Sequence, residues 1–199
     1  MMTKRDFIKS TAAAGAATGF IRPALATSAL ATVAPTFAPT AIAAVIYDDR
    51  LPESRAFAFE FAQRGIQPFE TGDDVATLWN GALGTLLEER PKARIAGLTA
   101  TDDFEALRRL AAERSLSTLY EGSHDFRPTR MTTEIVHSGP RSPDFVWMMR
   151  DAGADWPPTL AHAVLVARLT GPGRQHERVV TLGANAPSTP EPLTSWVIG

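Results

Sequence analysis

The sequence predicts an α/β fold in three layers, with helices on both faces of a mainly parallel sheet. Short apolar runs of strand length alternate with longer stretches that carry apolar residues at helical spacing, which is typical of βαβ units. An acidic pair follows each of the first three runs, at Asp48–Asp49, Asp73–Asp74 and Asp102–Asp103, where a helix is expected to begin. The hydrophobic content, 44% of 199 residues, suffices for one domain with its own core.

The first half of the chain contains the alternating elements in order. Residues 42–47 are continuously apolar, as in a strand buried on both faces. A helix is expected between Pro52, which suits a first turn, and Gly65. Residues 66–69 form a weak strand, and Pro68 cannot donate a ladder hydrogen bond, so this strand should lie at a sheet edge. The remaining elements are a helix from Thr71 to just before Pro91, a strand at 94–98, a helix at 102–114 and a strand at 116–121.

Four strands joined by right-handed crossovers pack most simply in the order 2-1-3-4. This order resembles that of flavodoxin-like sheets, and the resemblance implies a ligand site at the carboxyl ends of strands one and three, where the order reverses. After residue 125 an antiparallel C-terminal addition is expected. It comprises a strand at 131–137, a short helix at 145–150 and closing strands at 178–182 and 195–198. Residues 157–169 suit a helix or a strand, and the paired prolines at their start favour the helix.

The N-terminus carries an export motif. Residues 3–9 read Thr-Lys-Arg-Asp-Phe-Ile-Lys, and a short, mildly apolar stretch rich in alanine follows. Arg22 then precedes the small-residue site Ala24-Leu25-Ala26. This order of features resembles a twin-arginine (Tat) signal peptide, with Lys4 in place of the first arginine. The resemblance implies export of a folded protein to the periplasm or the cell exterior. The alternatives are a basic N-terminus without regular structure and an amphipathic transit helix.

We therefore expect a signal peptide at 1–26, an extended linker at 27–41 and a single α/β domain at 42–199. Residues 1–26 hold four of the 20 basic and one of the 22 acidic side chains, so the rest of the chain has a formal charge of −5. That charge argues against a nucleic-acid partner, because such binding depends on neutralising phosphates. No apolar run reaches the roughly 20 residues of a membrane span. The absence of cysteine excludes disulfide and thiolate chemistry.

Eight polar residues at the carboxyl ends of strands one, three and four form the expected rim of the ligand site. They are Asp48, Asp49, Arg50, Thr99, Thr101, Tyr120, Glu121 and His124. Acidic residues at helix starts repel phosphate, so the rim should favour a small polar or cationic ligand. The acidic pairs also have a purely structural interpretation, since an aspartate that caps free N–H groups stabilises a helix by about 1 kcal/mol.

The leading hypothesis is a non-enzymatic small-ligand-binding or accessory protein for an exported partner. The chain has no glycine-rich phosphate loop and no Gly-x-Ser-x-Gly elbow, and its histidines lack metal-ligand spacing, so no cofactor or metal is expected. The alternative is a small exported hydrolase or lyase in which His124 acts with a rim carboxylate, Asp48, Asp49 or Glu121. That mechanism requires His124 within hydrogen-bond reach of a carboxylate inside a cleft.

Overall fold

A computed structural model describes residues 41–140, 143–170, 173–187 and 191–199. All of these residues belong to one compact unit. The predicted signal peptide and all but the last residue of the predicted linker lie outside the described residues, and both remain predictions.

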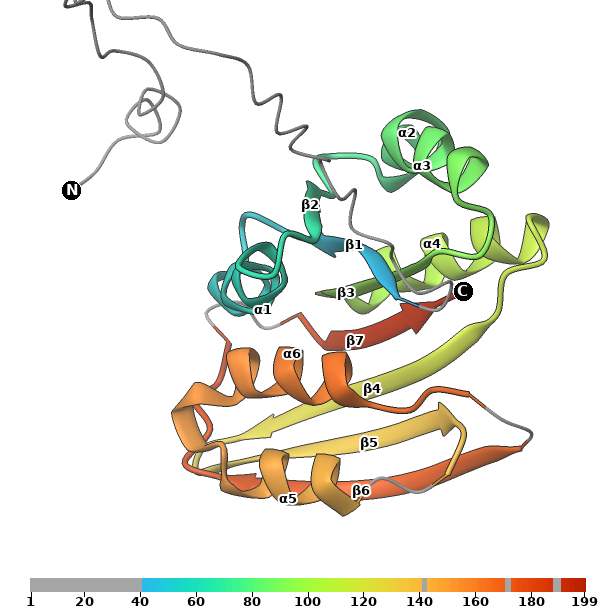
Figure 1. The fold of residues 1–199 in the computed structure, drawn as a ribbon. Coiled ribbons are helices and arrows are strands. Elements are labelled where there is room, and N and C mark those ends of the chain that lie inside the picture. The colour runs from blue at the N-terminus through green and yellow to red at the C-terminus, as the bar shows by residue number, and fades with distance from the viewer. Residues whose placement is uncertain (1–40, 141–142, 171–172, 188–190) are drawn as a thin grey trace, which may run out of the picture. The chain divides into compact units, whose positions relative to one another are not determined.

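The described strands form one mixed, seven-stranded sheet in the order β2-β1-β3-β7-β4-β5-β6 (Figure 1). They are β1 (Ile42–Tyr47), β2 (Gln67–Glu70), β3 (Arg94–Ala100), β4 (Thr118–Arg127), β5 (Arg130–Ser138), β6 (Arg174–Leu182) and β7 (Leu193–Ile198). β1 pairs in parallel with β2 and with β3, and every other neighbouring pair is antiparallel. The sheet is therefore parallel at its beginning and antiparallel over most of its width.

Helices cover one face along the whole sheet and the other face only over its first half (Figure 1). On one face lie α1 (Pro52–Ala62), α5 (Pro143–Asp151) and α6 (Trp156–Val166), with a 3-10 turn (Gly153–Asp155) between the last two. On the other lie α2 (Val75–Leu78), a π-helical turn (Trp79–Leu83), α3 (Gly84–Glu89) and α4 (Thr101–Glu113). Each face has its own apolar core, one containing Phe57, Leu160 and Val197, the other Trp79, Phe104 and Trp196. The α/β class and the helices on both faces agree with the sequence prediction.

The predicted order 2-1-3-4 is wrong at one position, because β7 lies between β3 and β4. Trp196 of β7 pairs with Gly97 on one side and with Glu121 on the other. Every residue of β7 is buried, whereas β4 alternates between buried and more exposed residues along most of its length. A strand buried on both faces belongs in the middle of a sheet, and a strand with a polar face belongs where one face meets water. Because β7 runs antiparallel to both β3 and β4, the expectation of a mainly parallel sheet is also wrong.

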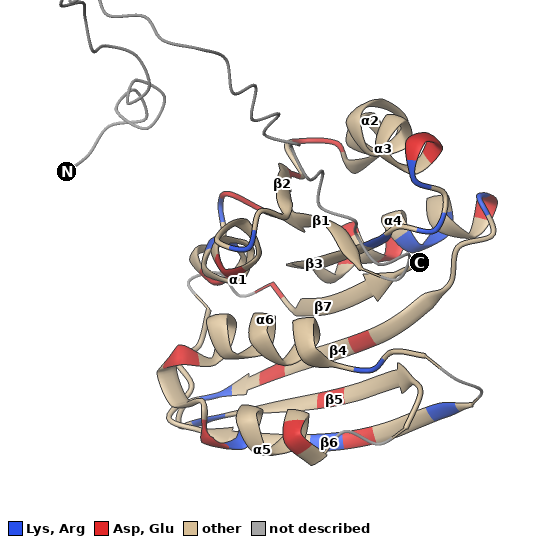
Figure 2. Cartoon of the chain, in the orientation of Figure 1, with Lys and Arg blue, Asp and Glu red and all other residues tan. Residues whose placement is uncertain are grey.

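The second half of the sheet keeps one face uncovered by the described helices. Figure 2 shows residues of both charges along β4, β5 and β6, and the strand register with its alternating burial puts Asp125, Glu134 and Arg178 on this face. Arg178 Nε lies 3.0 Å from a carboxylate oxygen of Glu134 on the neighbouring strand. Such exposed pairs add little stability, and their role is to keep this face hydrated.

Several element assignments are confirmed. Pro52 opens α1, β2 with Pro68 lies at the sheet edge, and residues 156–166 are helical rather than extended. The second helix is not continuous, because Gly81 takes a non-helical conformation (φ −95°, ψ −108°) inside the π-helical turn. β4 continues to Arg127, beyond the predicted end at residue 121, since its antiparallel partner β5 pairs with it from Tyr120 to Arg127.

Candidate functional site

A cavity of about 260 Å³ lies where β3 ends, α4 begins and the chain enters β7. We call it the acidic cavity. Its lining consists of three carboxylates, one guanidinium, one hydroxyl and two small apolar residues. These are Asp102, Asp103, Glu191, Arg50, Thr101, Ala100 and Pro192. The cavity occupies the end of the sheet at which open α/β sheets bind ligands.

Arg50 is held at the cavity by Asp48, the residue that follows β1. Asp48 is buried and accepts four hydrogen bonds from Arg50: one from its backbone N (2.9 Å), two from Nε (3.0 and 3.2 Å) and one from Nη2 (2.7 Å). Ser54 on α1 accepts from the Asp48 backbone N at 2.9 Å and donates to the carbonyl of Leu98, which ties β1, α1 and β3 together. Burial alone would raise the pKa of Asp48, but the hydrogen bonds and the positive charge of Arg50 together lower it. Asp48 therefore stays ionised and fixes the Arg50 side chain.

The pKa of the Asp103 carboxyl is raised by its surroundings. Burial raises its pKa, and the negative charges of Asp48, Glu191 and Asp102 raise it further, while Arg50 opposes them. Neither Asp102 nor Asp103 caps α4, because the N-cap position is Ala100 and no side chain accepts a hydrogen bond there. Both instead lie in the first turn of the helix, where the helix dipole favours negative charge.

Thr101 fastens the start of α4 to the start of β7. Its backbone N and its hydroxyl both donate to the carbonyl of Pro192 at 3.0 Å, and the hydroxyl also lies 2.9 Å from Thr194 Oγ1. Thr99 is fully buried and accepts a hydrogen bond from Trp196 Nε1 at 3.2 Å, so it supports β7 rather than lining the cavity.

Tyr120 and His124 lie away from this cavity, inside the core between the sheet and helices α5 and α6. His124 Nε2 is 2.9 Å from Ser195 Oγ, and Nδ1 is 3.0 Å from Thr133 Oγ1. The hydroxyl of Tyr120 contacts the same Ser195 Oγ at 3.0 Å. Burial lowers the pKa of His124 to about 3, which keeps the imidazole neutral. No described carboxylate lies within 4.0 Å of it, so the geometry required for the His124 enzyme hypothesis is not present.

The remaining predicted residues lie outside the cavity lining. Glu121 is half-buried and sits opposite Trp196 in the ladder with β7. The carbonyl of Asp49 accepts a hydrogen bond from Arg55, whose guanidinium also lies 4.0 Å from the Asp49 carboxylate. Of the eight predicted residues, only Arg50 and Thr101 line the acidic cavity directly, with Asp48 behind Arg50.

The three carboxylates of the lining, Asp102, Asp103 and Glu191, were not predicted as part of the site. Asp102 and Asp103 were interpreted as helix caps and were therefore left out of the predicted site. The capping interpretation is correct for Asp74, which accepts hydrogen bonds from the backbone N of Ala76 (2.9 Å) and Thr77 (3.3 Å). Glu191 carries no sequence signal, because its place in the site depends on the pairing of β7 with β3.

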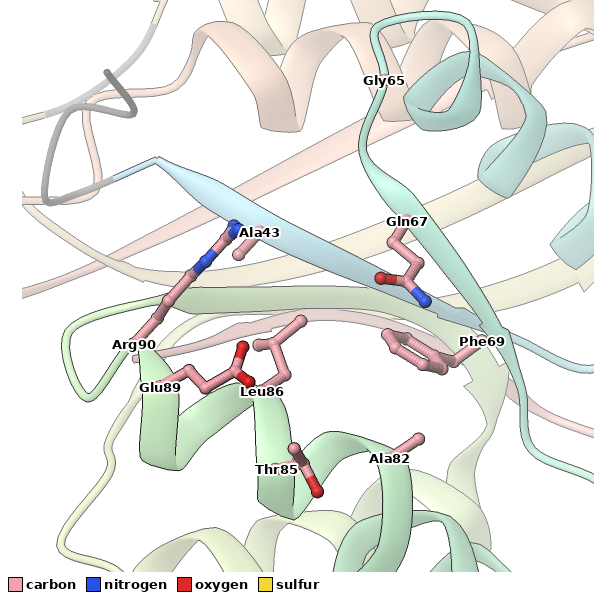
Figure 3. A pocket seen from close by; sticks show the side chains of 9 residues that line it. All are labelled: Ala43, Gly65, Gln67, Phe69, Ala82, Thr85, Leu86, Glu89 and Arg90. Atoms are coloured by element: carbon pink, nitrogen blue, oxygen red, sulfur yellow. The ribbon is translucent and has the colours of Figure 1, made fainter. Parts of the chain in front are cut away.

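A second cavity of about 420 Å³ lies between the amino ends of β1 and β2 and helix α3 (Figure 3). Figure 3 shows Gln67 and Phe69 of β2 and Leu86 and Glu89 of α3 projecting toward the same space. Glu89 and Arg90 contribute one charge of each sign to its lining. This cavity is larger but has no excess charge, and it lies away from the carboxyl ends of the strands, so it makes a weaker candidate site.

Comparisons with known proteins add no relative: no protein-family model, no curated protein and no solved structure matches this chain significantly. Within the described residues, no group of three or more His, Asp or Glu side chains is arranged to hold a metal ion. No helix in this part of the chain is both long and apolar enough to cross a bilayer.

Proposed function

We propose that the protein is an exported, non-enzymatic binding or accessory protein whose acidic cavity takes a small organic ligand with a cationic group. One observation carries this proposal: Asp102, Asp103 and Glu191 line one cavity together, and its single basic residue, Arg50, is already paired with Asp48. An ammonium or guanidinium group would neutralise this excess negative charge.

The raised pKa of Asp103 supports a cationic ligand. Burial disfavours its ionised form most, and the negative charges of Asp48, Glu191 and Asp102 add to that effect. A cation beside Asp103 would oppose that effect and favour its ionised form. The hydroxyl of Thr101 at the same wall adds a neutral hydrogen-bonding group for a ligand that also carries hydroxyls.

The volume of the cavity supports an organic ion over a bare metal ion. About 260 Å³ corresponds to roughly eight or nine waters at the volume of a water in the liquid. A divalent ion needs several oxygens within about 2.6 Å, which requires carboxylates that converge on one point. Diamines and guanidino compounds fit both the size and the charge.

The N-terminal motif supports export of this protein by the twin-arginine route. A periplasmic or extracellular location would give the cavity access to small cations outside the cytoplasm. Twin-arginine substrates leave the cytoplasm already folded, so the cavity would be formed before export. An exported partner protein is the natural recipient of such a ligand.

The proposal is tested by calorimetric titration of the purified protein with agmatine and putrescine at pH 7, with 1,4-butanediol as the uncharged control. We expect binding of the two cations only, weakened about tenfold or more by Asp103→Asn and by Glu191→Gln. Glu113→Gln, at the exposed far end of α4, is the matched control and should leave the affinity unchanged. Equal affinities in all variants would contradict the proposal, as would binding of the diol.

A further inference from the structure

A third cavity, of about 250 Å³, lies at the opposite end of the sheet, near the amino ends of β1 and β3. We call it the arginine cavity. Its walls come from the start of β1, the segment between α1 and β2, the start of β3, and the end of α6 with the loop after it. The lining residues are Ala41, Ile42, Arg64, Ile66, Arg94, Val164, Leu165, Ala167 and Leu169.

Arg94, the first residue of β3, is the decisive side chain in this cavity. It is half-buried, and its guanidinium donates to the carbonyl of Leu169 at 3.2 Å. No carboxylate among the described residues lies within 4.0 Å of it. Burial lowers the pKa of the Arg94 guanidinium, and no acidic side chain in the described part of the chain offsets the effect. A partly buried charge without a counter-ion is costly, and a bound anion would remove that cost.

The stem of Arg94 packs closely against Gly199. A Cβ at Gly199 would lie 2.6 Å from Arg94 Cγ, so the stem fits there only because residue 199 has no side chain. With the stem packed and Nη2 bonded to Leu169, the guanidinium is held before a ligand arrives, which reduces the entropy lost on binding.

Arg64 adds a second positive charge to the arginine cavity. It donates to the carbonyl (2.7 Å) and to the carboxylate (3.2 Å) of Glu60 and contacts His162 Nδ1 at 3.3 Å. Glu60 therefore offsets the charge of Arg64, while Arg94 remains uncompensated. The last turn of α6 contributes only about half a unit of negative charge, so positive charge stays in excess.

The other walls are apolar. Ile42, Ile66, Val164, Leu165 and Leu169 are buried or half-buried and surround the guanidinium. An inorganic ion would gain nothing from these side chains, whereas a hydrocarbon chain would bury its surface against them, at about 25 cal/mol for each Å². The cavity volume corresponds to roughly eight waters, so it admits an ion of about that many heavy atoms.

We propose that the arginine cavity binds a small carboxylate with a short hydrocarbon chain, with the carboxylate on Arg94 and the chain against Ile42, Ile66 and Leu165. Carboxylate and guanidinium match as a bidentate pair. This site goes beyond the acidic cavity: it lies at the other end of the sheet, and its ligand has the opposite charge.

The test is calorimetric titration of the purified protein with hexanoate at pH 7 and low salt. We expect binding of hexanoate that exceeds that of acetate and of hexan-1-ol, because only hexanoate has both the charge and the chain. Arg94→Gln should weaken hexanoate binding about tenfold or more. Arg94→Lys should weaken it less than Arg94→Gln, and Arg64→Gln should have the smallest effect of the three. Arg109→Gln, on the exposed side of α4, is the matched control and should bind like the unmodified chain.

A loss of fold is separated from a loss of site by two further measurements. The Arg94 variants should still bind agmatine in the acidic cavity, and Leu165→Asn should lose hexanoate selectivity over acetate while keeping Arg94. Equal binding of hexanoate by the unmodified chain and Arg94→Gln would overturn the proposal, and so would equal binding of acetate and hexanoate. Neither result bears on the acidic cavity, whose ligand is measured separately.

Discussion

His124 Nε2 lies 2.9 Å from Ser195 Oγ, with the indole ring of Trp156 closing the space above the imidazole at a centroid distance of 5.2 Å. Thr133 and Tyr120 complete a buried polar chain across β4, β5 and β7. A histidine beside a serine hydroxyl is a combination found in hydrolases, but here both side chains are enclosed by the core. The pair joins three strands and stabilises the fold.

Replacing His124 by alanine should destabilise the protein without affecting its ligands. The change opens a void and leaves the hydroxyls of Ser195 and Thr133 each short of a partner, at a cost of about 2–4 kcal/mol. Urea denaturation measures this loss. If His124→Ala instead keeps its stability but loses agmatine binding, the histidine belongs to a functional site after all.

The depressed pKa of His124 predicts loss of stability in acid. An unfolded histidine binds a proton below about pH 6.5, whereas the folded one stays neutral down to about pH 3. The free energy of unfolding that depends on neutral His124 is therefore fully present above pH 6.5. It declines as the pH falls from there toward 3, by about 1.4 kcal/mol for each pH unit. The measurement is urea denaturation at several pH values, and His124→Gln should show a flatter profile over this range.

Gly97→Ala should destabilise the protein by about 1–3 kcal/mol. A Cβ at Gly97 would overlap the indole ring of Trp196 and approach the carbonyl of Ile46, which is backbone and cannot move aside easily. Gly81→Ala is the control, because a Cβ there meets nothing within 4 Å. Thermal unfolding compares the two variants, and a similar melting temperature for both would mean that β7 shifts to accommodate the methyl group.

Removing the charge of Glu191 should lower the pKa of Asp103. Glu191 raises that pKa by repulsion, so Glu191→Gln favours the ionised form of Asp103. Titration of the side-chain carboxyl carbon by NMR measures the shift. The pKa of Asp74, which depends on hydrogen bonds within its own turn, should stay the same and is the internal control.

The export signal is testable by fractionation of cells that produce the full chain. Replacing Lys4 and Arg5 by glutamine should keep the protein in the cytoplasm in its full-length form, because the basic pair is the recognition element of such signals. Replacing Arg22 alone should have a smaller effect. Export of the double variant at the normal level would contradict the twin-arginine assignment.

The local features of the fold were predictable because they depend on neighbours in the sequence. Pro52 and Gly65 bound α1 through their own backbone preferences. Pro68 marks β2 as an edge strand because it lacks an N–H group. Apolar spacing in residues 102–114 is enough to identify α4, whatever the helix packs against.

The position of β7 was not predictable in this way, and it decided the candidate site. The sequence by itself determined the α/β class and most of the elements, and it predicted a ligand site at the carboxyl ends of β1 and β3. Only the tertiary structure inserted residues 193–198 between β3 and β4, which moved His124 into the core and brought Glu191 to Asp103. The reason is physical: pairing between strands about a hundred residues apart is selected by burial over the whole sheet, and no local pattern encodes that choice.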